Sequence, residues 1–169
     1  MTVLIQGEIG VGKSTLIRKL AETRPGPLYG FFTKKEPNGD GSFSVYIHPA
    51  QGEWKYTEEN LVGLIRPGRG REARPAAFDR AAPWLEKLPP EATVVLDELG
   101  VLEQDALRFQ RAVLELLQPS GRLVLAAVNP ADAPFLNRVR QSPDAVLYQV
   151  DRQNRDELTQ RLLSSVLKG

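Results

Sequence analysis

The sequence predicts an α/β fold, a three-layer sandwich in which helices cover both faces of a mainly parallel sheet. Short apolar segments alternate along the chain with longer amphipathic ones, which is the pattern of strands joined by helices. The later apolar segments show no polar alternation, so both faces of those strands are expected to be buried. With 169 residues, the chain is expected to form one domain over 1–169.

The first half of the chain combines this pattern with a β-hairpin insertion. The expected elements are a strand at 2–6, a helix at 14–22, two hairpin strands at 28–35 and 43–48, and a helix at 78–88. Residues 49–76 are rich in Gly, Pro and Arg, so we expect mainly a long loop there, with one short strand at 53–56.

The second half has the more regular alternation. Its expected elements are a strand at 93–96, a helix at 103–118, a strand at 122–128, a weaker helix at 131–141, a strand at 145–150 and a helix at 154–168. Pro134 is expected to break the weaker helix early, because proline lacks the N–H that a helix interior requires.

Composition excludes several classes of protein. The absence of cysteine removes disulfides, thiolate zinc sites and cysteine nucleophiles, and it suits a cytoplasmic location. A formal net charge of +1 gives no strong signal for nucleic-acid binding. No apolar run reaches the roughly 20 residues of a membrane span, and the N-terminus lacks the pattern of a signal peptide. We therefore expect no membrane partner.

The segment GEIGVGKS at 7–14 matches the Walker A pattern, G-x-x-x-x-G-K-[ST], and lies between an expected strand and an expected helix. Its glycines let successive N–H groups point into one concavity, and the helix dipole adds to the attraction for phosphate. Lys13 is expected to reach the β- and γ-phosphates, Ser14 to bind Mg²⁺, and Thr15 to meet the α-phosphate. The predicted nucleotide-binding residues here are Gly7, Glu8, Ile9, Gly10, Val11, Gly12, Lys13, Ser14 and Thr15.

Two acids, Asp97 and Glu98, end the expected strand at 93–96, as in a Walker B motif. An acid at this strand end steadies Mg²⁺ in P-loop proteins, and we assign that role to Asp97. Glu98 is interpreted as the group that orients or deprotonates a water aimed at the γ-phosphate. The alternative for Glu98 is a solvated acid or the start of a helix cap.

Asn129 follows the strand at 122–128 and is a candidate for contact with the γ-phosphate or the attacking water. The alternative is a turn residue before Pro130. The segments at 97–100 and 129–132 imitate the D-x-x-G and N-K-x-D motifs of GTPases, but proline replaces the lysine of the second. Selectivity for guanine is therefore unsupported.

Two further segments carry candidate ligand contacts. Asn154 and Arg155 follow the expected strand at 145–150, where they would flank the base or ribose, although Asn154 and Glu157 also fit a capping box. Arg66, Arg69 and Arg71 lie in a Gly- and Arg-rich loop at 66–74. That loop is a candidate lid over the phosphates, a nucleic-acid contact patch or simply a solvated loop.

Four segments together resemble the small P-loop nucleoside-triphosphatases first described in thermophiles, also called cancer-related nucleoside-triphosphatases. They are GEIGVGKSTLIRKL (7–20), GFFTKK (30–35), VVLDELGVLE (94–103) and VDRQNRDEL (150–158). The resemblance implies slow, Mg²⁺-dependent hydrolysis of several nucleoside triphosphates on a fold akin to small nucleotide kinases. The chain departs from the family pattern at Val101 and Leu102, where an acidic or methionine-containing stretch is usual, and over 49–76.

The sequence thus predicts an NTPase that cleaves ATP, GTP and other nucleoside triphosphates to diphosphate and phosphate, with Lys13, Glu98 and Asn129 as catalytic residues and Ser14 and Asp97 as metal ligands. A nucleoside, nucleotide or small-metabolite kinase on the same fold is the first alternative. In that case Glu98 would activate an acceptor hydroxyl. A nucleotide-dependent switch protein is the second alternative, and the sequence names no protein partner for it.

Overall fold

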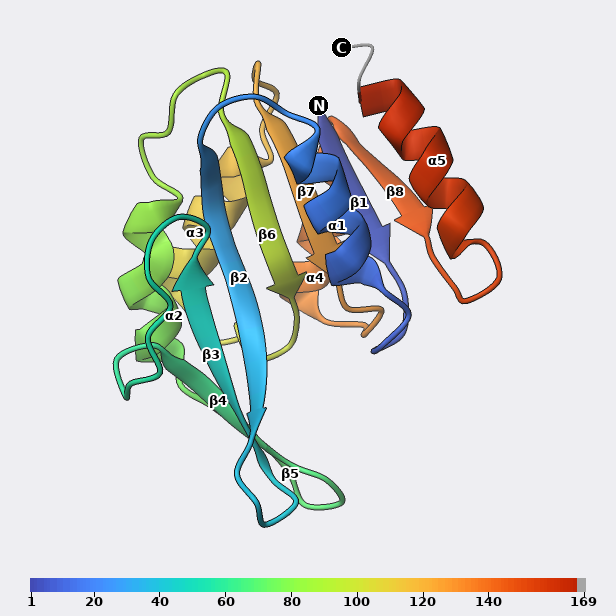
Figure 1. Ribbon diagram of the computed structural model, residues 1–169. Helices are drawn as coiled ribbons and strands as arrows, with labels where there is room; N and C mark the ends of the chain where they lie inside the picture. Colours follow the sequence, from blue (N-terminus) through green and yellow to red (C-terminus); the bar gives the residue numbers. More distant parts are fainter. Residues whose placement is uncertain (167–169) are drawn as a thin grey trace.

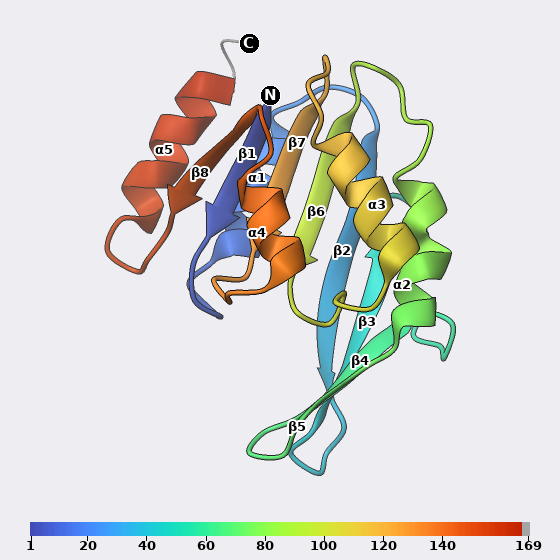
Figure 2. The ribbon, with the colours of Figure 1, turned by 180° about the vertical axis from the view of Figure 1, so that it is seen from behind.

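The computed structural model describes residues 1–166 as an eight-stranded sheet with helices on both faces (Figures 1 and 2). The strands are β1 (Thr2–Gln6), β2 (Leu28–Pro37), β3 (Phe43–Pro49), β4 (Leu61–Arg66), β5 (Gly70–Ala73), β6 (Thr93–Leu99), β7 (Leu123–Val128) and β8 (Ala145–Gln149). Their order in the sheet is β5-β4-β3-β2-β6-β7-β1-β8. The pairs from β2 through β6, β7 and β1 to β8 are parallel, which confirms the mainly parallel sandwich.

The helices divide between the two faces of this sheet. They are α1 (Lys13–Glu22), α2 (Pro75–Ala81), α3 (Leu107–Leu116), α4 (Pro134–Arg140) and α5 (Arg155–Val166), with a 3₁₀ turn η1 (Ala82–Trp84) after α2. Figure 1 shows α1 and α5 in front of the sheet, and Figure 2 shows α2, α3 and α4 over the opposite face. Each face therefore buries its own layer of side chains.

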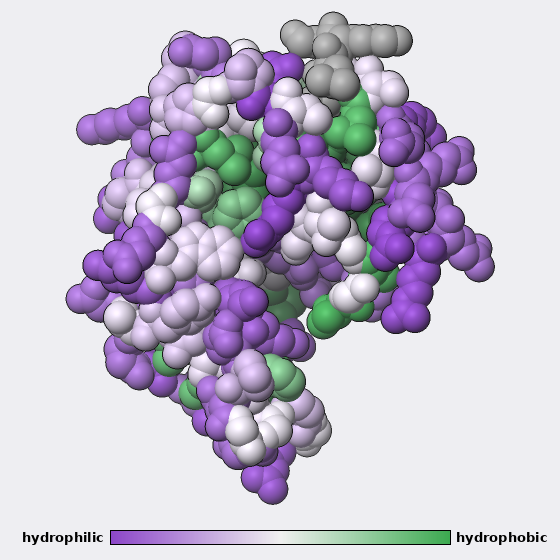
Figure 3. All heavy atoms as spheres, in the orientation of Figure 1, coloured by the Kyte–Doolittle hydropathy of each residue, from purple (hydrophilic) through white to green (hydrophobic). Residues whose placement is uncertain are grey.

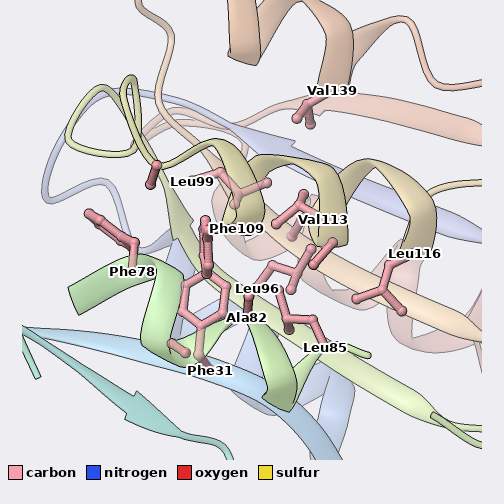
Figure 4. Packing of buried hydrophobic residues seen from close by; sticks show 14 of the residues in the cluster. Phe31, Phe78, Ala82, Leu85, Leu96, Leu99, Phe109, Val113, Leu116 and Val139 are labelled. Atoms are coloured by element: carbon pink, nitrogen blue, oxygen red, sulfur yellow. The ribbon is translucent and has the colours of Figure 1, made fainter. Parts of the chain in front are cut away.

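The two cores follow from the alternation of side chains along each strand. Phe31 faces the α2–α3 layer, where its ring lies 5.3 Å from the ring of Phe109. The ring of Phe109 also lies 5.1 Å from that of Phe78 on α2, and Figure 4 shows these three rings together. The next residue, Phe32, points to the α1 layer and belongs to the other core. The strand β2 thus serves both faces of the sheet.

The prediction of a long loop over 49–76 is wrong. The predicted hairpin is present as β2 and β3, and β4 and β5 extend it by antiparallel pairing. No strand forms at 53–56; the strands lie at Leu61–Arg66 and Gly70–Ala73 instead. All of β5 is exposed or half-buried, so it lacks the apolar pattern by which a strand is recognised.

Prolines explain two differences in the helices. The helix expected at 78–88 begins earlier, at Pro75, and gives way to a 3₁₀ turn that contains Pro83. The helix expected at 131–141 runs from Pro134 to Arg140, so Pro134 begins α4 and does not break it, because the first helical position needs no N–H donor. The helix expected at 103–118 begins only at Leu107, and the strand predicted at 145–150 ends at Gln149. Residues 167–168 of the last predicted helix lie outside the described residues.

The carboxyl ends of β6, β7 and β1 lie side by side at one edge of the sheet (Figure 1). The two hairpins, β2–β3 and β4–β5, project beyond this edge, and in Figure 3 the outline is indented where they leave the body. Ligands collect at such carboxyl ends in α/β sheets. Over residues 1–166, none of the helices has the length and apolar character of a membrane span.

Gly30 is required by the close approach of β2 to β6. Its φ is 95°, and a Cβ atom at this position would lie 2.0 Å from the carbonyl oxygen of Val95. We expect Gly30→Ala to destabilise the fold by about 3 kcal/mol or more, since a positive φ and a backbone clash both oppose it. Gly39→Ala is the matched control, because Gly39 has φ 83° but open space around it.

Denaturant unfolding of both variants is the measurement, and Gly39→Ala should cost about 1 kcal/mol, the strain of the positive φ alone. An equal loss of unfolding free energy in the two variants would contradict the close packing of β2 on β6.

Candidate active site

The loop at residues 7–12 connects β1 to α1 at the carboxyl edge of the sheet. Gly7 packs closely against Val150, the residue after β8, since a Cβ at Gly7 would lie 2.4 Å from the Val150 carbonyl oxygen. Gly10 and Gly12 have φ values of 80° and 102°, which let the chain curl before α1 begins at Lys13. The loop therefore presents a helix N-terminus to the space beyond the sheet, an arrangement suited to phosphate.

The ammonium group of Lys13 is almost fully buried, with the residue 4% exposed. Its Nζ donates to the carbonyl oxygens of Gly7 at 2.6 Å and Glu8 at 3.1 Å. The same Nζ lies 3.3 Å from a carboxylate oxygen of Glu98. Three oxygens thus hold the charge where β1 and β6 end, which offsets the cost of removing it from water.

Ser14 and Asp97 lie in direct contact below the loop. The Ser14 hydroxyl donates to Oδ1 of Asp97 at 2.8 Å, and Asp97 is 2% exposed. Burial raises the pKa of Asp97 to about 6, although the Ser14 bond opposes the shift. A buried carboxylate beside a hydroxyl is an oxygen donor pair of the kind Mg²⁺ uses together with phosphate and water. Among residues 1–166 no three acidic, His or Cys side chains are grouped so that they could hold a metal ion together.

Glu98 is held between the phosphate loop and the strand beside it. One carboxylate oxygen faces Lys13, and the other accepts from Nδ2 of Asn129 at 3.4 Å. Its backbone N–H donates to the Thr33 hydroxyl at 3.3 Å. The side chain keeps 27% of its surface exposed, so it is partly open to solvent. This is a positioned carboxylate, not a freely solvated one.

Asn129 combines the two alternatives that its sequence position left open. Its Oδ1 accepts from the N–H of Ala131 at 2.9 Å, as a turn residue would, while its Nδ2 reaches Glu98. Two hydrogen bonds hold its backbone. The Asn129 N–H donates to the Leu99 carbonyl at 2.9 Å, and the Asn129 carbonyl accepts from the Arg140 guanidinium at 2.7 Å. The turn therefore orients the amide toward the carboxylate.

Asn154 and Arg155 lie on the other side of the loop and differ in what they contact. The Asn154 amide accepts from the N–H of Asp151 at 2.9 Å and donates to the carbonyl of Gln149 at 2.9 Å, so it closes its own loop. The hydrogen bonds between Asn154 and Glu157 expected of a capping box do not form within the described residues, and the Asn154 side chain bonds Asp151 and Gln149 instead. Arg155 packs on the phosphate loop, with Cδ 2.8 Å from where a Cβ at Gly12 would stand.

A cavity of about 560 Å³ opens from the phosphate loop toward the projecting hairpins. Ser14, Glu98 and Asn129 line one end of it, and Arg66 and Arg71 line the other. Arg69, at the turn between β4 and β5, is not part of its wall. A second cavity of about 440 Å³ is lined, within the described chain, by none of the predicted site residues.

Two residues of this region carried no role in the sequence interpretation, Thr33 and Glu103. Thr33 lies in the GFFTKK segment, and its alternation with Phe31 would have placed it on the cavity face. Glu103 is 1% exposed, and its Oε1 accepts from the N–H of Gly100 at 3.0 Å. Burial, with a smaller contribution from Glu98, raises the pKa of Glu103 to about 7. The sequence signal for this contact was the position of Glu103 three residues after Gly100.

The sequence matches a family model described as NTPase over residues 2–163. The chain belongs to the NTPase family. Curated relatives include the protein named nucleoside-triphosphatase THEP1 from Thermotoga maritima, 29% identical over 99% of this chain and 96% of its own length. Another carries the name cancer-related nucleoside-triphosphatase, from Homo sapiens, and is 27% identical over 97% and 95% of the two chains. These matches confirm the resemblance that the four sequence segments indicated.

The fold also matches a solved structure. The crystal structure of THEP1 from Aquifex aeolicus superposes with a TM-score of 0.71, covering 98% of this chain and 99% of that one, at 23% identity. The match confirms the α/β fold class.

Glu103 makes the free energy of unfolding depend on pH. Because its folded pKa of about 7 lies above its ordinary value of 4.5, the folded protein binds this proton more tightly than the unfolded chain. That contribution to stability is complete below pH 4.5 and is lost as the pH rises through 7. Glu103→Gln keeps an acceptor for Gly100 but cannot ionise.

We therefore expect Glu103→Gln to gain stability relative to the natural chain between pH 5 and pH 8, by roughly 2 kcal/mol. Denaturant unfolding of the nucleotide-free protein at both pH values is the measurement. Glu115→Gln, a change at an exposed acid of α3, is the control and should show no such gain. If the free energies of unfolding of Glu103→Gln and the natural chain differ by the same amount at pH 5 and at pH 8, the buried state of Glu103 is contradicted.

Proposed function

We propose that the protein hydrolyses nucleoside triphosphates to diphosphate and phosphate, slowly, with Mg²⁺ and with broad base specificity. The observation that carries the proposal is the position of Glu98. Its carboxylate stands between the ammonium of Lys13 and the amide of Asn129, at the wall of a cavity that opens from the phosphate loop. A carboxylate there is suited to take a proton from a water aimed at the γ-phosphate. The family and the printed names of the relatives support the same reaction.

In this proposal the triphosphate binds along residues 7–15. The backbone N–H groups of the loop surround the β-phosphate, and the Thr15 end of the loop meets the α-phosphate. Lys13 exchanges its contacts with the Gly7 and Glu8 carbonyls for oxygens of the β- and γ-phosphates. The guanidinium of Arg155, packed against Gly12, is near enough to the loop to add a further positive charge.

Ser14 and Asp97 would hold Mg²⁺ beside the phosphates. Their mutual contact at 2.8 Å and the burial of Asp97 match the donor set that Mg²⁺ uses when phosphate and water supply its other ligands. The bound ion would neutralise charge on the β- and γ-phosphates. It would also stabilise the ionised form of the buried Asp97 carboxylate, whose pKa is raised because the group is removed from water.

Glu98 and Asn129 would act on the water. The Asn129 amide orients the Glu98 carboxylate, which accepts the proton as the water oxygen attacks the γ-phosphorus. Glu98 lies 3.3 Å from Lys13, and in this proposal the contact opens before both groups serve the phosphate. That rearrangement supports a slow reaction.

Broad base specificity is supported by the loop at residues 151–154. The Asp151 carboxylate accepts from the N–H groups of Gln153 and Asn154, and the Asn154 amide is bonded to Asp151 and Gln149. Oδ1 of Asp151 and Oδ1 of Asn154 are thus engaged within the loop, which lowers the capacity of these two side chains to distinguish one base from another.

The test is Glu98→Gln, which keeps the shape and the contact with Asn129 but removes the base. We expect phosphate release from Mg²⁺-ATP to fall at least about 100-fold while nucleotide affinity is retained. The control is Glu91→Gln, an exposed acid just before β6, at the strand end opposite Glu98. Release is measured with ATP, GTP, CTP and UTP, and again with EDTA.

Rates for the four triphosphates should agree within about tenfold, since one tenfold step corresponds to the loss of a single hydrogen bond. EDTA should abolish release. Near-natural release by Glu98→Gln would remove Glu98 from the reaction. Release by only one of the four triphosphates would contradict the broad specificity.

A further inference from the structure

The cavity beside Glu98 is larger than hydrolysis requires. Attack on a γ-phosphate needs one water between the phosphate and Glu98, whereas the cavity of about 560 Å³ continues to the turn between β4 and β5. Sites for small organic molecules have volumes of about 300–1,000 Å³. Because Gly10 and Ser14 also line the cavity, the γ-phosphate fills one end of it, and the part between Glu98 and the turn is the space for a second small molecule next to the triphosphate.

One wall of this cavity is a single face of the antiparallel strands. Lys35 on β2 pairs with Val45 on β3, and Ile65 on β4 pairs with Arg71 on β5, so each pair points to the same side of the sheet. All four residues line the cavity. The wall is thus apolar at its centre and cationic at its edges.

The opposite wall comes from the segment that follows β6. Val101 and Leu102 line the cavity there, and the Leu102 side chain lies 3.0 Å from where a Cβ at Gly63 would stand. The segment therefore rests on the extension of the sheet and closes the cavity between them. Together the two walls provide an apolar middle, with Glu98 at one end and the arginines at the other.

The arginine end has free capacity for an anion. Arg66 faces Glu72 at 3.4 Å, an exposed contact. Arg71 has no ion pair or hydrogen bond with any residue in the described part of the chain, although it forms part of the cavity wall. A guanidinium facing a cavity without a carboxylate partner is suited to bind a phosphate or carboxylate in two-point contact.

Glu103 supplies a second, independent observation at the same cavity. It lines the wall while only 1% exposed, and its Oε2 is buried without a hydrogen-bond partner within residues 1–166. Buried polar atoms are almost always paired. A hydroxyl donor on a bound molecule would satisfy this oxygen.

We propose that the cavity binds a second substrate, a small molecule with an anionic group for Arg71 and a hydroxyl next to Glu98, and that the γ-phosphoryl group is transferred to this hydroxyl. The inference rests on the proposed function, because the donor is the same triphosphate held by the same loop. Hydrolysis is then the reaction with water when the cavity holds no acceptor.

The transfer balances with the groups present. The hydroxyl oxygen forms a bond to the γ-phosphorus, and the bond from that phosphorus to the bridging oxygen breaks. The nucleoside diphosphate leaves with the electron pair, and the hydroxyl proton passes to the Glu98 carboxylate. The products are a phosphate ester and a nucleoside diphosphate, with no oxidant or further reactant.

The experiment uses ATP labelled at the γ-phosphate and a panel of hydroxyl compounds at millimolar concentration. Phosphate monoesters are represented by glycerol 3-phosphate, ribose 5-phosphate and the nucleoside 5′-monophosphates, and carboxylates by glycerate. We expect label in one of these compounds and more ADP than inorganic phosphate. Which half of the panel accepts label identifies the anionic group.

Arg71→Ala and Arg69→Ala form a matched pair, because both remove an arginine near the same turn but only Arg71 lines the cavity. Arg71→Ala should raise the acceptor concentration for half-maximal transfer at least about tenfold, the effect of one charge-assisted contact. Arg69→Ala should behave as the natural chain.

Three results would overturn the inference while leaving hydrolysis intact. They are ATP cleavage with no labelled acceptor across the panel, faster phosphate release without a labelled ester, and equal effects of Arg69→Ala and Arg71→Ala. Failure of the proposed function is distinguishable, since no ADP would form in any sample, with or without an acceptor.

Discussion

The buried ammonium of Lys13 is the interaction on which the rest of the site depends. A charge at 4% exposure is tolerated only with close oxygen partners, and here they come from Gly7, Glu8 and Glu98. These partners belong to the loop after β1 and to the end of β6, with β7 lying between the two strands. The parallel order β6-β7-β1 is therefore what brings a phosphate-binding loop and a carboxylate to the same point.

The sheet edge also fixes the orientation of the polar groups around Lys13. Arg140 on α4 donates to the Gln6 side chain at 2.6 Å and to the Asn129 carbonyl at 2.7 Å, tying the ends of β1 and β7 together. Glu103 holds the turn after β6 through Gly100. The reactive carboxylate, Glu98, is thus supported by residues outside the phosphate loop, on both sides of it.

The sequence predicted the parts of the fold whose local pattern matches their structure. The phosphate loop was readable because glycine spacing, a strand before it and a helix after it all agree. The strand β5 was not, because GREA at 70–73 is exposed or half-buried, and only its pairing with β4 makes it a strand. The sequence also did not show that Arg71 lines the cavity while Arg69 does not, because this difference depends on how β4 and β5 pair. The satisfied amide of Asn154 depends on tertiary contacts in the same way.

Hydrolysis in water enriched in oxygen-18, followed by phosphorus NMR of the products, tests most directly whether a water beside Glu98 attacks the γ-phosphate of a triphosphate held at Lys13. The predicted result is one labelled oxygen in each inorganic phosphate and none in the nucleoside diphosphate. Label in the diphosphate, or release of monophosphate and pyrophosphate, would show attack at another phosphorus and contradict this placement of the triphosphate.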